Sequence, residues 1–230
     1  MQRKIITTGD GSHSIEVSGK NEFYHSKFGA IQESLHVYIG AGLKPLLNTN
    51  LAIRIFEMGF GTGLNVLLTL IEAERHQQKI YYETIELFPL EASLAKALNY
   101  CEQLQRKDLQ EIFEQFHACE WGKQIIITSC FSFKKIKADL TDYPLPDFTN
   151  LIYYDAFDPN AQPELWQEEI FKRLFDSLYH NGILTTYCSK SMVRRAMQNA
   201  GFIVEKLPGA PGKREMIRAI KMDNKETKPG

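Results

Sequence analysis

Two hydrophobic periods alternate along the chain from residue 52 onward. Runs of apolar and β-branched residues, typical of buried strands, cover residues 52–58, 80–87, 125–128, 132–138, 150–156, 182–188 and 202–207. Helical patterns separate many of these runs, at residues 64–75, 89–116, 165–180 and 192–200. We interpret Asn181 and Gly182 as the stop signal of the third helix. The alternation predicts an α/β fold, a mostly parallel sheet with helices on both faces.

The two ends of the chain add further elements. Their patterns predict a helix after Ser26 and short strands over residues 4–7, 14–17 and 215–220, the last of them antiparallel to its neighbours. We expect a single domain over residues 1–221, in which residues 1–50 form an N-terminal extension. Residues 222–230 are expected to be a disordered tail.

The composition is that of a globular protein. The chain has 230 residues, of which 43% are hydrophobic and 24% charged, and this excludes a disordered or collagen-like chain. No apolar run reaches the roughly 18 residues that would span a membrane, and the N-terminus turns polar before a signal-type core forms. The four cysteines are scattered along the chain. We therefore expect a protein of the reducing cytoplasm.

Charge is distributed unevenly. The formal net charge of −1 does not by itself indicate a nucleic-acid binder. Residues 183–230 nevertheless hold 10 Lys or Arg and 4 Asp or Glu, so this segment carries +6 and the remainder carries −7. A basic segment on an acidic body fits local contact with a polyanion, and it equally fits a solvated face followed by a tail.

A glycine-rich loop follows the strand predicted at residues 52–58. Open parallel sheets bind ligands beyond the carboxyl ends of their strands, which is where this loop falls. Its glycines are Gly59, Gly61 and Gly63, and the dinucleotide fingerprint would place the third one residue later, at Leu64. Glu57 precedes the loop and suits a cationic ligand better than a pyrophosphate. A plain tight turn is the alternative interpretation of such a triplet.

Acidic residues end the strands that follow. Glu86 is placed to accept both hydroxyls of a ribose, or to favour the N-terminus of the next helix. Asp139 is placed to accept a hydrogen bond from an adenine amino group. Asp155 ends the strongest strand and should lie beside the reactive group of any ligand held by the glycine loop, with plain capping as its alternative role.

Other chemistries lack their motifs. The six histidines show no paired metal-ligand spacing, and neither a hydrolase nucleophile elbow nor a triphosphatase phosphate loop is present in the sequence. The glycine loop, the series of acids and the last antiparallel strand together resemble a class I S-adenosylmethionine methyltransferase, which has a Rossmann-like sheet.

A narrower resemblance covers nearly the whole chain and rests on residues 10–14, 22–26, 29–33, 36–37, 60–65, 82–86, 155–157, 163–166, 186–190 and 211–216. In these stretches the chain resembles the methyltransferase part of the MnmC family. The resemblance implies Asp155 as the catalytic residue that holds an amine. It also implies that S-adenosylmethionine binds through Glu57, Gly59, Gly61, Gly63, Asn65, Glu86 and Asp139.

The resemblance further implies a reaction. That family methylates the exocyclic amine of 5-aminomethyl-2-thiouridine, or of its oxygen analogue, at the wobble position of tRNA. Two-domain members carry a C-terminal FAD oxidase; no second dinucleotide fingerprint occurs here, so we expect a standalone methyltransferase whose amine substrate comes from a partner or another route. Contacts to the tRNA anticodon region are expected from Tyr24, His25, Lys190, Arg194, Arg195, Lys213 and Arg214.

Two other functions remain open at this point. The glycine loop and Asp155 would also serve an enzyme acting on small amines, either an N-methyltransferase or an aminopropyltransferase that uses a decarboxylated cofactor. From another class, a catalytically silent subunit with a cofactor-binding fold would bind RNA or a partner protein, although it would not need the whole series of acids.

Overall fold

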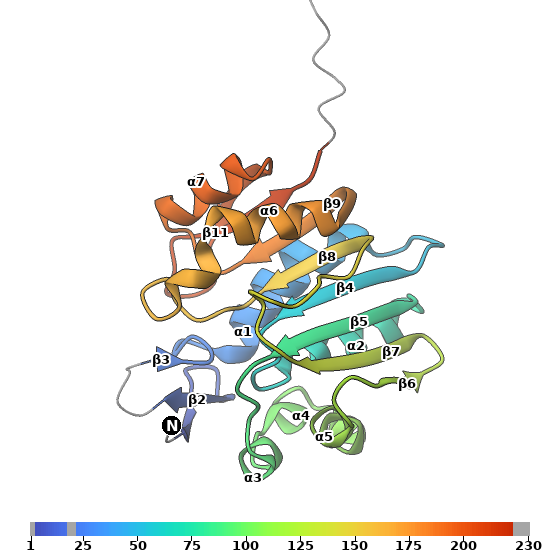
Figure 1. The fold of residues 1–230 in the computed structure, drawn as a ribbon. Coiled ribbons are helices and arrows are strands. Elements are labelled where there is room, and N and C mark those ends of the chain that lie inside the picture. The colour runs from blue at the N-terminus through green and yellow to red at the C-terminus, as the bar shows by residue number, and fades with distance from the viewer. Residues whose placement is uncertain (1–2, 18–21, 223–230) are drawn as a thin grey trace, which may run out of the picture.

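The computed structural model describes residues 3–17 and 22–222, and in this part of the chain two sheets are found. The smaller sheet, in the N-terminal extension, consists of β1 (Arg3–Thr7), β2 (His13–Val17) and β3 (Glu22–Phe23). The larger sheet has the strand order β10-β11-β9-β8-β4-β5-β7-β6 (Figure 1). Its strands are β4 (Ile53–Met58), β5 (Ile80–Glu86), β6 (Gln124–Thr128), β7 (Phe131–Lys137), β8 (Thr149–Tyr154), β9 (Leu178–Thr186), β10 (Ile203–Pro208) and β11 (Glu215–Ile220).

The centre of the large sheet is parallel and its edges are antiparallel. β4 pairs in parallel with β5 and β8, β5 with β7, and β8 with β9. β6 is antiparallel to β7, and β11 lies antiparallel between β9 and β10, which confirms the predicted reversed last strand. The chain continues from β4 to β5 on one side and later returns to β8 on the other. The carboxyl ends of β4 and β8 therefore form a topological switch point, where ligands bind in such sheets.

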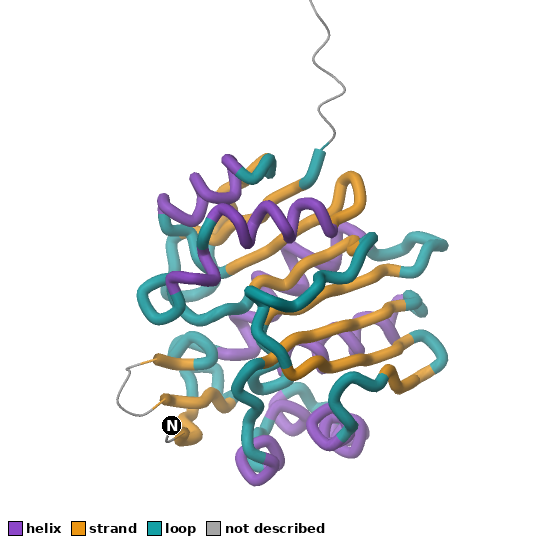
Figure 2. The backbone as a smooth tube through the Cα atoms, viewed as in Figure 1, coloured by secondary structure: helices purple, strands orange, loops and turns teal. Residues whose placement is uncertain are grey.

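Helices cover both faces of the sheet, as predicted. Figure 2 shows two helices in front of the sheet, α6 (Glu168–Ser177) and α7 (Ser191–Asn199), while α2 (Leu64–His76) lies behind it. Successive residues of a strand face opposite sides, so Ile53 and Ile55 of β4 join the core beneath α2, whereas Phe56 joins the core beneath α6. The remaining helical segments are α1 (Ala30–Ser34), η1 (Leu35–Leu43), η2 (Lys44–Leu46), α3 (Ala92–Lys96), α4 (Tyr100–Gln103), η3 (Lys107–Leu109), α5 (Gln110–Ala118) and η4 (Pro163–Trp166).

The helix expected after Ser26 changes type along its length. α1 is an α-helix of five residues, and η1 continues it as a π-helix of nine residues. π-Helical turns are rare and frequently occur near functional sites. Here the π-helix buries the ring of Tyr38 against Tyr153, at 5.2 Å between ring centroids.

The helix predicted over residues 165–180 is wrong at both ends. α6 begins at Glu168 and ends at Ser177, and β9 starts at the next residue. Thr149 pairs with Leu178 whereas Leu151 pairs with Ile183, so the intervening residues of β9 bulge out of register. Asn181 has a φ of 60° and its amide donates to the carbonyl of Lys221 at 2.8 Å. The Asn181-Gly182 pair thus turns the backbone within β9. The amide of Asn181 there provides a hydrogen-bond donor for the carbonyl of Lys221, which follows β11.

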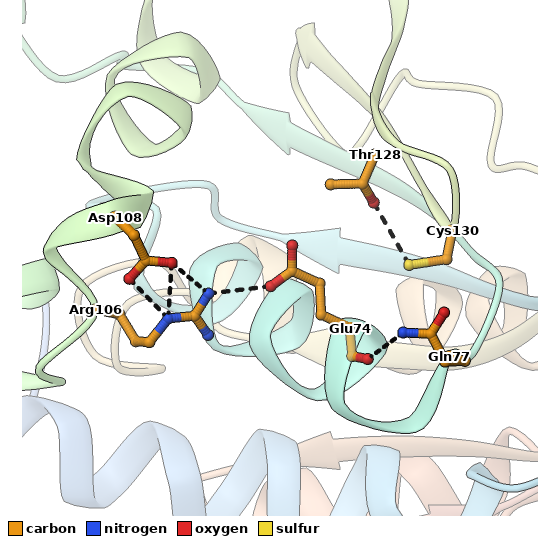
Figure 3. Close-up of polar contacts among 6 residues, drawn as sticks. All are labelled: Glu74, Gln77, Arg106, Asp108, Thr128 and Cys130. Carbon is orange, nitrogen blue, oxygen red and sulfur yellow. Dashed lines mark hydrogen bonds and ion pairs between the residues drawn. The ribbon is translucent and has the colours of Figure 1, made fainter.

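Arg106 connects two helical segments that flank the sheet. Its guanidinium contacts Glu74 of α2 at 3.2 Å and Asp108 of η3 at 2.8 Å (Figure 3). The same figure shows the end of α2, where the side-chain amide of Gln77 donates to the carbonyl of Glu74 at 2.8 Å. The side chain of Arg106 therefore fixes the position of α2 relative to the turn that precedes α5.

In the described part of the chain, helices fall short of the length and apolar character that a membrane span requires. Of the predicted disordered tail, only Met222 is described, and residues 223–230 lie outside the described residues.

Candidate active site

A cavity of about 300 Å³ opens at the carboxyl ends of β4, β5 and β8. Its size fits a site for a small molecule. The glycine loop, Glu86 and Asp155 supply one part of its wall. The N-terminal extension supplies another part, through residues from Arg3 to Glu33. The predicted meeting of the strand ends at one site is therefore confirmed by the geometry.

Gly59 allows the ends of β4 and β8 to lie in contact. Its φ is 94°, and a Cβ at this position would lie 2.7 Å from the carbonyl oxygen of Asp155. The amide of Asp155 donates to the carbonyl of Met58 at 3.0 Å, and the amide of Gly59 donates to the carbonyl of Ile85 at 3.1 Å. Any other residue at this position would strain the backbone and separate the loop from the acid.

Glu86 is tied to the loop by backbone hydrogen bonds. Its Oε2 accepts from the amide of Gly61 at 3.0 Å, and its Oε1 accepts from the amide of Phe88 at 2.8 Å. Each carboxylate oxygen keeps a further lone pair, and the side chain lines the cavity, so it can also accept the hydroxyls of a ribose. Beside it, Phe88 lines the cavity with an exposed aromatic ring.

Asp155 lines the cavity, and polar side chains surround its carboxylate. The side-chain amide of Asn65 donates to its Oδ2 at 3.0 Å. Burial raises the pKa of Asp155 to about 7 and the carboxylate of Glu33 acts in the same direction, while Tyr38, Asn65 and Lys213 act against them. Both protonation states are therefore accessible near neutral pH, which suits a group that exchanges a proton with a ligand.

Glu57 lies beneath the loop instead of in the cavity. It alternates with the residues of β4 that face α6, so its side chain points to the α2 side, level with Thr84 of β5. The residue is 1% exposed, and among the described residues its Oε2 has no hydrogen-bond partner. Burial raises the pKa of Glu57 to about 8, and the nearby Asp155 adds to this. A pKa in this range favours the neutral form of the side chain near pH 7. The contact of Glu57 with a cationic cofactor stays a prediction.

Two other predicted cofactor residues are not among the described residues that line the cavity. Asp139 accepts hydrogen bonds from the amide and hydroxyl of Thr141, at 2.9 and 2.8 Å, and so stabilises a local turn after β7. Gly63 is the N-cap of α2 and packs against His117. The contact of Asp139 with adenine stays a prediction.

The predicted substrate residues divide into two groups. Tyr24, His25 and Lys213 line the cavity. Lys213 donates to Glu33 at 2.6 Å and lies 4.1 Å from the ring centroid of Tyr187. Lys190 is paired with Asp158, a lining residue, at 2.6 Å.

The second group consists of three arginines. Arg194 and Arg195 belong to α7, and Arg214 precedes β11; Arg195 and Arg214 are exposed and Arg194 is half-buried. None of the three is among the described residues that line the cavity. A ligand that extends beyond the cavity could contact these three side chains.

Several lining residues were not predicted. Tyr187 directly follows β9, so the rule that ligands bind at strand ends would have identified it. Arg3 and Glu33 reach the cavity only because the N-terminal extension packs across the sheet. The Arg3 guanidinium donates to the carbonyls of Phe88 and Pro89, at 2.6 and 2.7 Å, across 85 and 86 residues of sequence. No local pattern in the sequence marks such a contact.

The fold and the site define a class: a Rossmann-like α/β protein that binds a nucleoside-containing cofactor at the switch point of its sheet. The chain belongs to a family of S-adenosyl-L-methionine-dependent methyltransferases, whose model matches residues 98–222. Its cofactor is therefore S-adenosylmethionine, and the cavity residues fit it: the glycine loop admits a ligand to bare backbone, and Glu86 keeps acceptor capacity. No group of side chains suited to a metal ion occurs among the described residues.

Similar proteins point to one kind of enzyme. The chain is 28% identical over 203 residues to the tRNA 5-methylaminomethyl-2-thiouridine biosynthesis bifunctional protein MnmC of Campylobacter hominis, covering 86% of this chain and 30% of that protein. The MnmC protein of Leptospira borgpetersenii is 29% identical over 213 residues, covering 86% and 32%. The chain thus spans about a third of the length of these relatives.

Solved structures share the fold. The crystal structure of MNMC2 from Aquifex aeolicus matches with a TM-score of 0.74 and 22% identity, covering 95% of this chain and 70% of that one. Spermidine synthase from Thermotoga maritima matches with a TM-score of 0.51 and 14% identity, covering 96% and 72%.

Proposed function

We propose that this methyltransferase acts on the exocyclic amine of 5-aminomethyl-2-thiouridine, or of its oxygen analogue, at the wobble position of tRNA. The product would be the 5-methylaminomethyl nucleoside. The names of the relatives support this substrate. The observation that carries the proposal is the position of Asp155, an acid that faces the cavity directly beside the glycine loop.

Asp155 fits the requirements of an amine acceptor. S-Adenosylmethionine, when bound, supplies an electrophilic methyl group on a sulfonium. An alkylamine has a reference pKa of about 10.4 and is mostly protonated at pH 7, so the enzyme must orient the amine and remove a proton. The side-chain amide of Asn65 holds Oδ2 of Asp155, and the carboxylate lines the cavity, where an amine can reach it. The carboxylate would accept a proton from the ammonium before attack, which frees the nitrogen lone pair, and would orient the neutral amine by a hydrogen bond. The carbon–nitrogen bond would then form as the sulfur–methyl bond breaks, with S-adenosylhomocysteine as the leaving group and the extra proton of the product amine lost to solvent.

The surroundings of the cavity suit a flipped-out base. A wobble base must leave the anticodon stack before its substituent can enter a closed site. Aromatic rings of Tyr24, Phe157 and Tyr187 line the cavity, and Lys213 stands among them. Arg194, Arg195 and Arg214 lie outside it and are proposed to contact the RNA backbone.

The proposed substrate already carries an aminomethyl group. A separate reaction must supply this group, because methyl transfer from S-adenosylmethionine does not create an aminomethyl group. We propose that the enzyme works with such an activity, either in another protein or in a further domain.

The deciding experiment is methyl transfer from labelled S-adenosylmethionine to bulk tRNA from cells that lack this enzyme, followed by nucleoside analysis. Label in 5-methylaminomethyl-type uridine is the expected result. A parallel reaction offers small amines without RNA. Label in those amines alone, or no label on either acceptor although S-adenosylhomocysteine binds, would overturn the proposal.

A further inference from the structure

Thr62, which lies between Gly61 and Gly63 of the glycine loop, is held from two sides. Its hydroxyl lies 2.7 Å from Nε2 of His25, and its carbonyl lies 3.1 Å from Nε2 of His117. His25 belongs to the N-terminal extension, 37 residues from Thr62 in sequence, and His117 lies near the end of α5, 55 residues away. Two distant elements therefore meet at one residue of the loop, and that residue is 1% exposed.

Both imidazoles are neutral in this arrangement. Burial lowers the pKa of His25 to about 4, and it lowers the pKa of His117 to about 4. A carbonyl oxygen can only accept, so Nε2 of His117 carries the proton and donates to Thr62. The backbone of His117 is fixed in turn, because the ammonium of Lys135 donates to its carbonyl oxygen.

The segment that carries His25 also packs on the loop backbone. A Cβ at Gly61, where φ is 50°, would lie 3.1 Å from Cδ1 of Tyr24. The amide of His25 donates to the hydroxyl of Ser14 at 3.0 Å, and the amide of Ser26 donates to Glu33 at 2.8 Å. The segment is thus anchored on both sides of His25, and the imidazole is directed at the loop.

We propose that His25 is a positioning residue for the cofactor: with His117 it clamps Thr62 and so fixes the glycine loop for S-adenosylmethionine. The N-terminal extension then completes the cofactor site, and His25 does not contact RNA. This inference depends only on the cofactor of the family and holds for any methyl acceptor.

The test is the affinity of the full chain for S-adenosylhomocysteine, measured by calorimetry without RNA. His25→Ala and the near-isosteric Thr62→Val each remove the same hydrogen bond, and we expect each to raise Kd by about tenfold. The double variant should bind no more weakly than either single variant, because residues that share one interaction are not additive. His25→Gln, whose amide reaches a similar distance, should recover most of the affinity.

His13→Ala is the matched control. His13 also joins the extension to the rest of the fold, through Nδ1 and the carbonyl of Ala97 at 3.0 Å, and it does not line the cavity. The Kd of His13→Ala for S-adenosylhomocysteine should equal that of the parent chain. Urea unfolding should show similar stability for His13→Ala and His25→Ala.

Three results would each overturn the clamp: full additivity of His25→Ala and Thr62→Val, no recovery in His25→Gln, or an unchanged Kd in His25→Ala accompanied by a higher KM for tRNA. Failure of tRNA methylation by the parent chain would refute the proposed function and would leave this measurement intact.

Discussion

At the scale of single residues, two acids near the glycine loop differ in their surroundings. Asp155 lines the cavity with a side-chain amide on one oxygen, while Glu57 is enclosed beneath the loop with Oε2 unpartnered among the described residues. Burial raises the pKa of both, to about 7 and about 8. In the proposed reaction Asp155 exchanges a proton with the substrate, whereas burial favours the neutral form of Glu57.

Replacing Asp155 by Asn should separate catalysis from cofactor binding. The amide keeps a carbonyl oxygen for the hydrogen bond from Asn65 but cannot accept a proton. We expect kcat for methyl transfer to fall by about 10²–10³-fold, the usual contribution of a positioned acid–base group. Calorimetry with S-adenosylhomocysteine should give a Kd within about threefold of the parent. A kcat that survives the substitution would remove Asp155 from the mechanism.

Replacing Glu57 by Gln should flatten the dependence of stability on pH. The folded state binds the Glu57 proton more tightly than the unfolded state, whose pKa is near the ordinary 4.5. The free energy of unfolding therefore falls as pH rises from about 4.5 to about 8, and this loss ends above pH 8. Gln does not titrate, so between about pH 5 and pH 8 the parent should lose on the order of 3 kcal/mol more than the variant.

Urea unfolding at several pH values measures this difference. Glu111→Gln, at an exposed position of α5, is the control and should follow the parent. Equal slopes for Glu57→Gln and the parent would show that Glu57 is ionised in the folded protein.

At the scale of elements, the sequence predicted the sheet well because buried parallel strands are apolar along their length. Residues 52–58, 80–87 and 150–156 correspond to β4, β5 and β8, and the acids at the ends of the last two, Glu86 and Asp155, line one cavity. The error at Leu178 has a specific cause. Tyr179 and the Asn181-Gly182 pair fit a helix and its stop equally well, and only pairing with β8 and with Lys221 selects the bulged strand.

Long-range contacts explain what could not be predicted at the site. His25 and His117 reach Thr62 because two separate elements pack on the glycine loop, and neither histidine has a distinctive spacing. Glu57 is absent from the cavity lining for another reason. The motif identified the acid, but the alternation of β4 turns its side chain to the α2 side, where it is buried beneath the loop. Its role toward the cofactor stays a prediction.

Arg106 provides a prediction about how the elements are held together. Its planar guanidinium contacts two carboxylates at once, which a lysine cannot reproduce. We expect Arg106→Lys to lower the free energy of unfolding by about 1 kcal/mol. The Kd for S-adenosylhomocysteine should not change, because Arg106 is not among the described lining residues.

A neighbouring, exposed ion pair serves as the control for the Arg106 variant. Lys107 contacts Glu102 at 3.2 Å with both side chains well exposed, and Lys107→Ala should cost only a few tenths of a kcal/mol. An Arg106→Lys variant as stable as this control would show that the guanidinium does not fix α2.

At the scale of the whole molecule, the basic C-terminal segment has some of its positive charges paired with acids and others exposed. Several basic residues of the C-terminal segment are paired, including Lys190 with Asp158 and Lys213 with Glu33 at the cavity. Arg195 and Arg214 are exposed, and they belong to the same segment. The acidic remainder of the chain would repel a polyanion, so RNA that reaches the cavity should be held from this one segment.

This arrangement predicts a localised salt dependence of tRNA binding. The triple variant of Arg194, Arg195 and Arg214 to Ala should weaken binding at least about tenfold and reduce the slope of log Kd against log salt by about 2, since each phosphate contact contributes roughly 0.7–0.9. The matched control replaces Arg75, Lys107 and Lys123, three exposed cations elsewhere on the molecule, and changes the net charge equally. The control should keep the slope of the parent. If both triple variants flatten the slope alike, only the total charge acts, and if neither does, the three arginines do not contact RNA; either result would contradict the prediction. If the arginine variant alone flattens the slope, the RNA lies across α7 and the loop before β11.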